Sequence, residues 1–254
     1  MVRIGTIRSA ILPGCSSTRF GPSWSKMLEQ NVASMGYQVV EVTNLFGHTA
    51  VEFRQLLNQN GLRAITNTVL INQLRNELDR TIADSLALGA CYVALAIISE
   101  ETLTSLDSLT AFAAEMNELG RKLCSYGLQL LYHHHSFELV TVNGELLLER
   151  LFRLLDPRFV QAELDLGRAA NSGVDPARLL RLFAERAPLV HVKDVDAMGN
   201  FTEVGRGVVP YTRLFPLMRE TGVKFAFVEQ DTSDAPLASA RMSLEYLKGL
   251  GFMY

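Results

Sequence analysis

Residues 61–97, GLRAITNTVLINQLRNELDRTIADSLALGACYVALAI, contain the repeat that decides the fold. The β-branched run over residues 63–68 predicts a strand, and the apolar periodicity of residues 72–88 predicts a helix that ends at Gly89. The nearly continuous apolar run over residues 91–97 is typical of a buried parallel strand. This strand–helix–strand order predicts a parallel sheet.

The same alternation extends from this segment to both ends of the chain. Further strands are expected at residues 2–7, 38–42, 128–132, 160–165, 189–193 and 225–229, and further helices at residues 23–35, 49–60, 109–126, 145–155, 176–185, 211–220 and 236–250. Each strand–helix unit takes about 32 residues, close to the length of a βαβ element. We therefore predict an α/β fold, a (β/α)8 TIM barrel that forms one domain over residues 1–254. A doubly wound open sheet is the alternative, which the lack of a GxGxxG after the first strand disfavours.

Composition narrows the class of protein. The chain has 24 basic and 27 acidic residues, a net charge of −3, and no basic stripe, so nucleic-acid binding is not expected. No apolar run approaches the roughly 20 residues that cross a bilayer, and Pro13 and Gly14 interrupt any signal-peptide core. Three widely spaced cysteines form no CxxC pair, which argues against a disulfide framework or a thiolate zinc site. We expect a cytoplasmic protein.

Polar side chains gather at the predicted ends of four successive strands. In a (β/α)8 barrel the carboxyl ends of the strands form the active-site face. The last four predicted strands end in HHHSFE, ELD, HVKD and VEQD, which begin at His133, Glu163, His191 and Val228, whereas the first four end in Thr, Asn, Arg, Ile or Ser. The chemistry is therefore expected on one half of the rim.

Mixed carboxylate and imidazole donors suit a divalent metal ion of intermediate hardness. The candidate ligands are Glu138, Asp165, His191 and Glu229. We expect Mn²⁺, with Mg²⁺, Co²⁺ or Zn²⁺ as alternatives. Each residue also has a structural interpretation: His191 as a hydrogen-bonded core residue, Asp165 as a cap of the next turn, and Glu229 as part of a solvated loop.

In series, these segments resemble the xylose-isomerase-like TIM barrels, the sugar phosphate isomerase/epimerase family that also holds inosose dehydratases and endonuclease IV. The resemblance covers essentially the whole chain. It rests on YHHHSFEL (132–139), similar to a Tyr-His-Asn-His-x-x-Glu-Phe motif, and on ELDLGRAANSGVDP (163–176), LVHVKDVD (189–196), VGRGVVPY (204–211) and FVEQD (227–231).

The resemblance implies metal ligands at Asp165, His191 and Glu229, with Glu138 as the fourth ligand and His135 as its alternative. The chain departs from the family pattern in three places. His134 replaces an asparagine, Arg168 replaces a tryptophan, and Arg206 replaces a glutamate. Either guanidinium could recognise a carboxylate or phosphate, or could simply pair with a neighbouring acid.

The implied activity is proton transfer next to a carbonyl, with Glu138 and Glu229 as the two catalytic carboxylates and a metal-stabilised enediolate. His133, His135, Arg168, Lys193 and Arg206 are expected to contact the substrate. We expect an isomerase or epimerase of a keto-sugar or polyol. A metal-dependent lyase of the inosose or keto-glycoside type is the alternative, and a non-catalytic metal-binding barrel is a third interpretation. The expected partner is a small molecule, without nucleic acid or membrane, and homo-oligomerisation is left open.

Overall fold

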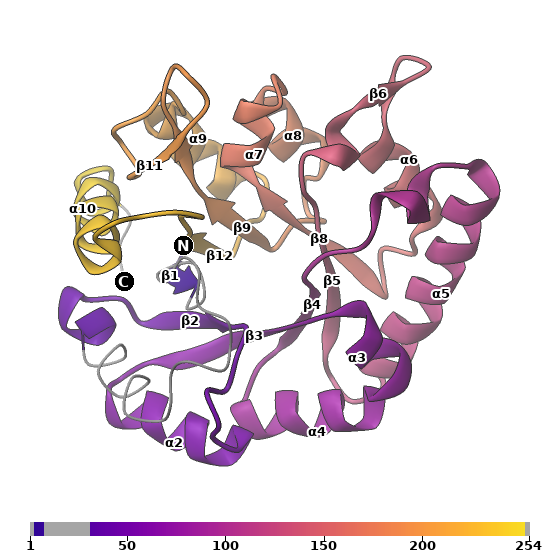
Figure 1. Cartoon of the computed structure of the whole chain (residues 1–254), viewed down its shortest axis with the longest axis horizontal. Helices are drawn as coiled ribbons and strands as arrows, with labels where there is room; N and C mark the ends of the chain where they lie inside the picture. The colour runs from indigo at the N-terminus through magenta and orange to yellow at the C-terminus, as the bar shows by residue number, and fades with distance from the viewer. Residues whose placement is uncertain (1–2, 8–30, 252–254) are drawn as a thin grey trace.

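Eight parallel strands close into a barrel with the helices outside it (Figure 1). The computed structural model describes residues 3–7 and 31–251. Around the barrel the strands are β1 (Arg3–Ile7), β2 (Val39–Val42), β3 (Arg63–Val69), β4 (Tyr92–Leu95), β5 (Gln129–His133), β8 (Val160–Asp165), β9 (Leu189–Val192) and β12 (Phe225–Val228). Because β1 pairs with both β2 and β12, the described part of the sheet has no free edge. The predicted TIM barrel is confirmed.

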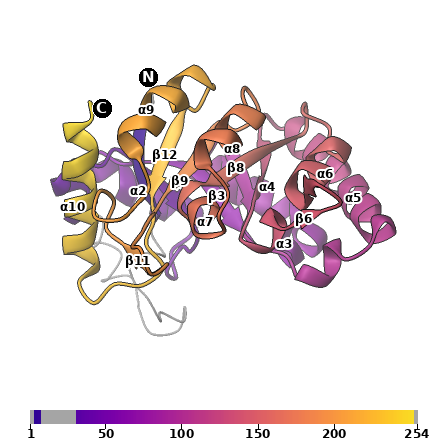
Figure 2. The same cartoon turned by 90° about the horizontal axis from the view of Figure 1, so that it is seen from above.

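The helices follow the strands in sequence order and form the outer ring (Figures 1 and 2). They are α2 (Ala50–Gln59), α3 (Ile71–Asn76), α4 (Leu78–Leu88), α5 (Leu106–Cys124), α6 (Leu147–Leu154), α7 (Leu166–Asn171), α8 (Pro176–Leu182), α9 (Tyr211–Glu220) and α10 (Pro236–Gly249), with 3₁₀ turns η1 (Glu100–Leu103) and η2 (Phe137–Leu139). The helix predicted at residues 23–35 is seen only at residues 31–35; the remainder lies outside the described residues.

Local signals in the sequence set several helix ends. Thr49 and Glu52 form a capping box at the start of α2, and Asp175 caps α8 just before its first-turn proline. Gly89 ends α4 at φ 76°, a left-handed conformation that costs glycine little. The single helix predicted over residues 72–88 is two helices, because the backbone at Glu77 (φ −132°, ψ 32°) leaves the helical region.

Two short hairpins interrupt the regular alternation on the side of the barrel where the strands end. One is β6 (Thr141–Val142) with β7 (Glu145–Leu146), and the other is β10 (Asp194–Val195) with β11 (Phe201–Thr202). Of the described helices, none has the length and apolar character needed to span a bilayer.

The barrel interior is divided into an apolar layer and a polar layer. A separate apolar cluster fills the barrel: Val39, Ile65, Tyr92, Ala94, Leu131, Leu189 and Phe227. A much larger cluster lies between the strands and the surrounding helices. Because side chains two residues apart lie on the same face of a strand, the next inward positions toward the strand ends form a layer directly above this apolar one.

Candidate active site

The upper layer of the barrel is made of buried polar side chains. On four strands, the residue two positions after a member of the apolar cluster inside the barrel is Glu or His. These residues are Glu41 after Val39, His133 after Leu131, His191 after Leu189, and Glu229 after Phe227. Glu163 and Asp165 add two further carboxylates from β8, and both are fully buried. We call these six residues the acidic cluster: Glu41, His133, Glu163, Asp165, His191 and Glu229.

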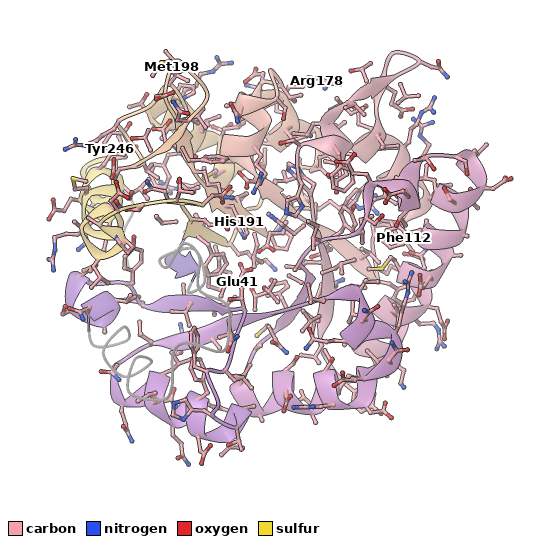
Figure 3. The ribbon with its side chains drawn as sticks, viewed as in Figure 1. Glu41, Phe112, Arg178, His191, Met198 and Tyr246 are labelled. Atoms are coloured by element: carbon pink, nitrogen blue, oxygen red, sulfur yellow. The ribbon has the colours of Figure 1, made fainter. Side chains whose placement is uncertain are left out.

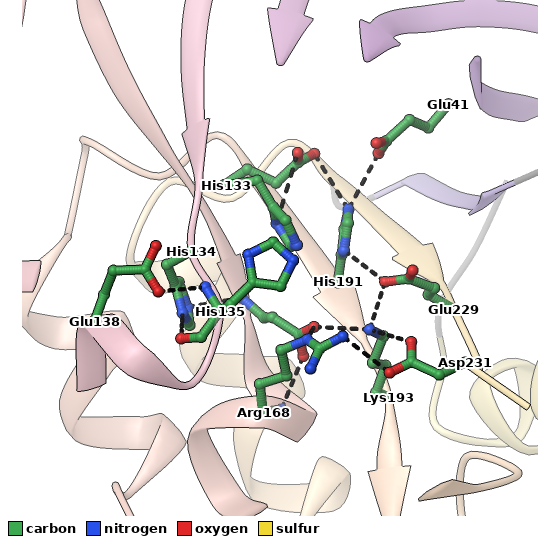
Figure 4. A network of polar contacts seen from close by, with 12 residues as sticks. Glu41, His133, His134, His135, Glu138, Arg168, His191, Lys193, Glu229 and Asp231 are labelled. Carbon is green, nitrogen blue, oxygen red and sulfur yellow. Dashed lines mark hydrogen bonds and ion pairs between the residues drawn. The ribbon is translucent and has the colours of Figure 1, made fainter. Parts of the chain in front are cut away.

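His191 stands at the centre of the acidic cluster (Figure 4). Its Nε2 lies 3.1 Å from Glu41 Oε2 and 3.5 Å from Glu163 Oε1. Its Nδ1 lies 2.8 Å from Glu229 Oε2. The wider view shows that Glu41 and His191 both lie inside the ring of strands (Figure 3). The two ring nitrogens of one histidine therefore face carboxylates from three different strands, β2, β8 and β12.

Two cations border the acidic cluster. Lys193 is 1% exposed, and its Nζ lies 3.0 Å from Asp165 Oδ2, 2.8 Å from Glu229 Oε2 and 2.8 Å from Asp231 Oδ1. Arg168 pairs with Asp231 at 2.9 Å and with Asp165 at 3.3 Å. Both cations lie over the Phe201 ring of β11. The interpretation of Arg168 as a partner of neighbouring acids therefore agrees with its contacts.

Asp165 combines two functions in one carboxylate. Its Oδ1 accepts a hydrogen bond from the backbone N–H of Arg168 and so caps α7. Its buried Oδ2 lies 3.0 Å from Lys193 Nζ and 3.3 Å from Arg168 Nε. The capping role that the sequence offered as an alternative is present, and it leaves one oxygen facing the acidic cluster.

The donor atoms in the acidic cluster fit a bound cation. Among the described residues, His133 Nδ1 and both carboxylate oxygens of Glu163 are buried without a hydrogen bond, whereas Asp165 Oδ2, Glu229 Oε2 and His191 Nδ1 are held in ion pairs with Lys193, with Arg168 or with one another. Buried polar atoms are rarely left without a partner because their desolvation is not repaid. The close groups His133–Asp165–His191 and Glu41–Glu163–His191 each bring three ligand atoms within 4.8 Å of one another. The mixture of oxygen and imidazole donors is the one expected for a transition-metal dication.

Glu138 lies outside both of these groups. The Tyr132 hydroxyl donates to its Oε1 at 2.7 Å, and the His135 backbone N–H donates to its Oε2 at 2.8 Å. Both oxygens are thus engaged, one by β5 and the other by the segment that follows it. The structure does not bring Glu138 together with Asp165, His191 and Glu229, because η2 turns its side chain back toward β5.

The three consecutive histidines have different environments. His133 belongs to the acidic cluster, and its ring lies 4.2 Å from that of His191. His134 is fully buried and receives the Asp165 backbone N–H on Nε2 at 3.0 Å, while its Nδ1 lies 3.0 Å from the His135 carbonyl oxygen. Both nitrogens of His134 are therefore used in holding the backbone. His135 is half-buried beside His133 and stacks on Phe137.

Burial and charge separate the pKa values of these groups. Burial together with the negative charge of Glu41 raises the pKa of Glu163 to about 8. For Glu229, burial acts in the same direction, but the charges of Lys193 and His191 outweigh it and lower the pKa. Burial would lower the pKa of His191, yet the surrounding carboxylates raise it well above its usual range. The acidic cluster thus holds one carboxyl group suited to carry a proton beside one that stays ionised.

Burial favours the neutral form of the three consecutive histidines. It lowers the pKa of His134 and of His135 to about 4, and it lowers the pKa of His133 well below its ordinary value.

Arg206 is exposed on the loop before α9, and no hydrogen bond or ion pair among the described residues joins it to the acidic cluster. Its loop is instead organised by Asp194, whose carboxylate accepts hydrogen bonds from the backbone N–H groups of Gly205, Gly207 and Val209.

A cavity of about 710 Å³ lies beside the acidic cluster, between helix α4 and the segments that follow β2 and β3. Thr68 lines it and also contacts Glu41.

Sequence reasoning missed Glu41, Glu163 and Asp231. The expectation that the chemistry lies on one half of the rim is incomplete, because Glu41 reaches the centre from β2 on the other half. Its signal was a lone acid in the apolar run Val39–Val42. The signal for Glu163 was its position two residues before Asp165, on the same face of β8.

Residues 30–250 match the family described as xylose isomerase-like TIM barrel. The chain belongs to this family. Within the xylose isomerase-like family, the chain is 27% identical to an inosose dehydratase of Geobacillus kaustophilus, over 86% of this chain and 85% of that protein.

Solved structures confirm the fold at lower sequence identity. A sugar phosphate isomerase/epimerase from Parabacteroides distasonis superposes with a TM-score of 0.82 at 18% identity, covering 99% of this chain and 100% of that one. An L-ribulose 3-epimerase superposes with a TM-score of 0.76 at 15% identity, covering 99% and 95%. The fold is therefore shared with proteins named as a sugar phosphate isomerase/epimerase and an L-ribulose 3-epimerase, whereas the relative found by sequence is named as an inosose dehydratase.

Proposed function

We propose that the protein is a divalent-metal-dependent isomerase or epimerase of a keto-sugar or related polyol, which acts by removing a proton next to the substrate's carbonyl group. The observation that supports it most is the set of buried carboxylate and imidazole atoms that converge at the carboxyl ends of the barrel strands. Carboxylates and an ammonium group of separated pKa at one site are typical of acid–base catalysis.

In this proposal Asp165, His191 and Glu229 are the metal ligands, and His133 supplies a further donor in place of Glu138. The mixed oxygen and nitrogen set favours Mn²⁺, with Co²⁺, Zn²⁺ or Mg²⁺ as alternatives. A bound dication would polarise the carbonyl and hydroxyl oxygens of the substrate. The inward face of the barrel would then be reserved for a polar small molecule, since its walls are carboxylates, imidazoles and the Lys193 ammonium group.

Glu229 is the proposed base, because its lowered pKa keeps it ionised and Lys193 and His191 fix its position. Glu163 replaces Glu138 as the second proton carrier, because its raised pKa allows it to hold a proton near neutral pH. Lys193 is the proposed donor to a substrate oxygen. His133 and His135, both neutral, contact hydroxyl groups, and Arg168 borders the entrance.

A second candidate function is dehydration of an inosose-type ketone. It is favoured by the 27% identity to an inosose dehydratase along 86% of the chain. The same base would remove the same proton, and a β-hydroxyl would then leave. Lys193 would donate the proton that the departing oxygen needs.

The test incubates the Mn²⁺-loaded protein with a panel of ketohexoses and an inosose in deuterated water, followed by NMR and ultraviolet absorbance. An isomerase or epimerase incorporates deuterium next to the carbonyl and yields an isomer, whereas a dehydratase yields an absorbing enone. Glu229→Gln should lower the rate by a factor of about 10² to 10⁴ while the protein stays folded. Glu115→Gln, which removes a surface carboxylate paired with Arg75, should keep full activity. Unchanged turnover in Glu229→Gln would remove that residue from the mechanism.

A further inference from the structure

Glu41 is a buried carboxylate on β2 that no described contact joins to a surface cation. It is 1% exposed, and both of its oxygens have specific partners. The Thr68 hydroxyl donates to Oε1 at 2.5 Å, and His191 Nε2 lies 3.1 Å from Oε2 in hydrogen-bonding geometry. Hydrogen bonds thus link Thr68 on β3 to Glu41 on β2, and Glu41 to His191 on β9 in the acidic cluster.

We infer that Glu41 is a positioning residue that fixes which nitrogen of His191 faces the metal ion; this inference rests on the metal centre of the proposed function. A ligating imidazole must be neutral, so one ring nitrogen keeps its proton while the other binds. Glu41 holds that proton on Nε2 and leaves Nδ1 as the ligand atom. Carboxylates behind metal-binding histidines commonly act in this way.

The surroundings of Nδ1 are compatible with this tautomer. His191 Nδ1 lies 2.8 Å from Glu229 Oε2, which also pairs with Lys193 Nζ at 2.8 Å. Two atoms that each bind a metal at about 2.0–2.2 Å and at a right angle to one another are separated by roughly 2.9 Å. Nδ1 and Glu229 Oε2 are therefore close enough to bind one ion together, while Nε2 is occupied by Glu41.

The Thr68 hydrogen bond restricts rotation of the Glu41 carboxylate. A carboxylate held at one oxygen only can rotate, whereas Glu41 is held at both. Glu163 Oε1, the other acidic oxygen near Nε2, is farther at 3.5 Å and makes no hydrogen bond. The orientation of the His191 ring thus depends on Glu41 rather than on Glu163.

The competing interpretation makes Glu41 itself a metal ligand, since Glu41, Glu163 and His191 also form a close group. Substitution separates the two. In Glu41→Gln the amide oxygen can still accept from His191 Nε2, while its NH₂ group faces the Thr68 oxygen. Glu41→Ala removes the acceptor. A neutral amide replaces a carboxylate well as a hydrogen-bond acceptor but poorly as a ligand of a dication.

The experiment measures Zn²⁺ affinity by competition with a chromophoric chelator, for the wild type, Glu41→Gln, Glu41→Ala and Thr68→Val. We expect affinity within about threefold of the wild type for Glu41→Gln and a loss of about 10- to 100-fold for Glu41→Ala. Thr68→Val, which keeps the shape of the side chain, should lose a few-fold and serves if Glu41→Ala does not fold. The ¹⁵N shifts of His191 in the Zn²⁺-bound protein should report a proton on Nε2.

Three results would overturn the inference. An equal loss in Glu41→Gln and Glu41→Ala would make Glu41 a ligand, and wild-type affinity in Glu41→Ala would leave it without a role. A proton on Nδ1 would reverse the proposed tautomer. If the wild type itself binds no divalent ion, the proposed metal centre fails as well, which distinguishes that failure from a failure of the Glu41 assignment alone.

Discussion

At the scale of single residues, the site depends on carboxylates whose two oxygens make separate contacts. Asp165 caps α7 with one oxygen and presents the other to the acidic cluster. Glu41 binds Thr68 with one oxygen and His191 with the other. Glu138 uses both oxygens to hold the segment after β5. The number of local hydrogen bonds thus decides which carboxylate remains available for chemistry.

Glu138 should make stability depend on pH. Burial raises its pKa to about 7, while the hydrogen bonds from Tyr132 and His135 oppose that rise. Because the folded pKa exceeds the unfolded value of about 4.5, its stabilising contribution is complete below that value and is lost as the pH rises through about 7. The loss amounts to at most about 3 kcal/mol.

The check compares urea unfolding of the wild type and Glu138→Gln at pH 4.5 and pH 8. The variant lacks the titrating group, so the difference in unfolding free energy between the two proteins should shift between these pH values in favour of the variant at pH 8. The exposed variant Glu115→Gln is the control. A difference that stays constant with pH would show that Glu138 keeps an ordinary pKa.

Residue choices at the site were only partly readable from the sequence. The sequence predicts Asp165, His191 and Glu229 because they lie near the carboxyl ends of three successive strands, and all three lie in the acidic cluster. Glu138 was selected because of a motif, but its own backbone contacts direct it elsewhere. Glu41 could not be predicted because its contact with His191 forms only when the sheet closes into a barrel. No local sequence pattern shows that closure.

At the scale of elements, the close contact between α7 and the end of β9 positions Lys193. Gly167 of α7 lies so near that an added Cβ would collide with Cβ of Lys193 and lie 2.8 Å from its carbonyl oxygen. The Tyr211 hydroxyl donates to that same carbonyl oxygen at 2.6 Å. The Lys193 backbone is thus held from two helices.

Gly167→Ala should therefore displace Lys193 and lower both stability and activity. We expect a loss of about 1–3 kcal/mol in unfolding free energy, typical of overpacking, and at least a tenfold loss in the rate of deuterium exchange. Gly249→Ala, in α10 where an added Cβ meets no atom within 4 Å, is the matched control and should be neutral or slightly stabilising. Full activity and stability in Gly167→Ala would show that α7 does not constrain Lys193.

Elements with strong local signals were predicted well, and the exceptions have physical reasons. The strand over residues 160–165 and the helix over residues 211–220 match the structure, although α9 begins without a side-chain cap and contains Pro216. Strand β7 of the β6–β7 hairpin falls at the start of the helix predicted over residues 145–155. The hairpin's Asn143–Gly144 turn, with φ of 53° and 83°, is a two-residue hairpin signal that outweighs the helical pattern after it.

At the scale of the whole molecule, the barrel explains why the site is buried and yet polar. An apolar layer closes the lower interior, and the acidic cluster lies directly above it, so charges from six strand positions share one volume. Carboxylates this close repel one another unless cations separate them. Lys193 and Arg168 do so on one side, and on the His133 and Glu163 side the described residues supply no further Lys or Arg contact.

We expect the acidic cluster to hold a divalent ion. Anomalous diffraction at the manganese absorption edge, from a crystal of the protein grown with Mn²⁺, tests it directly. We expect one anomalous peak at about 2.0–2.3 Å from oxygen or nitrogen atoms of Asp165, His191 and Glu229, and away from Glu138. A peak bound by Glu138 or His135, or no peak in the acidic cluster, would contradict it.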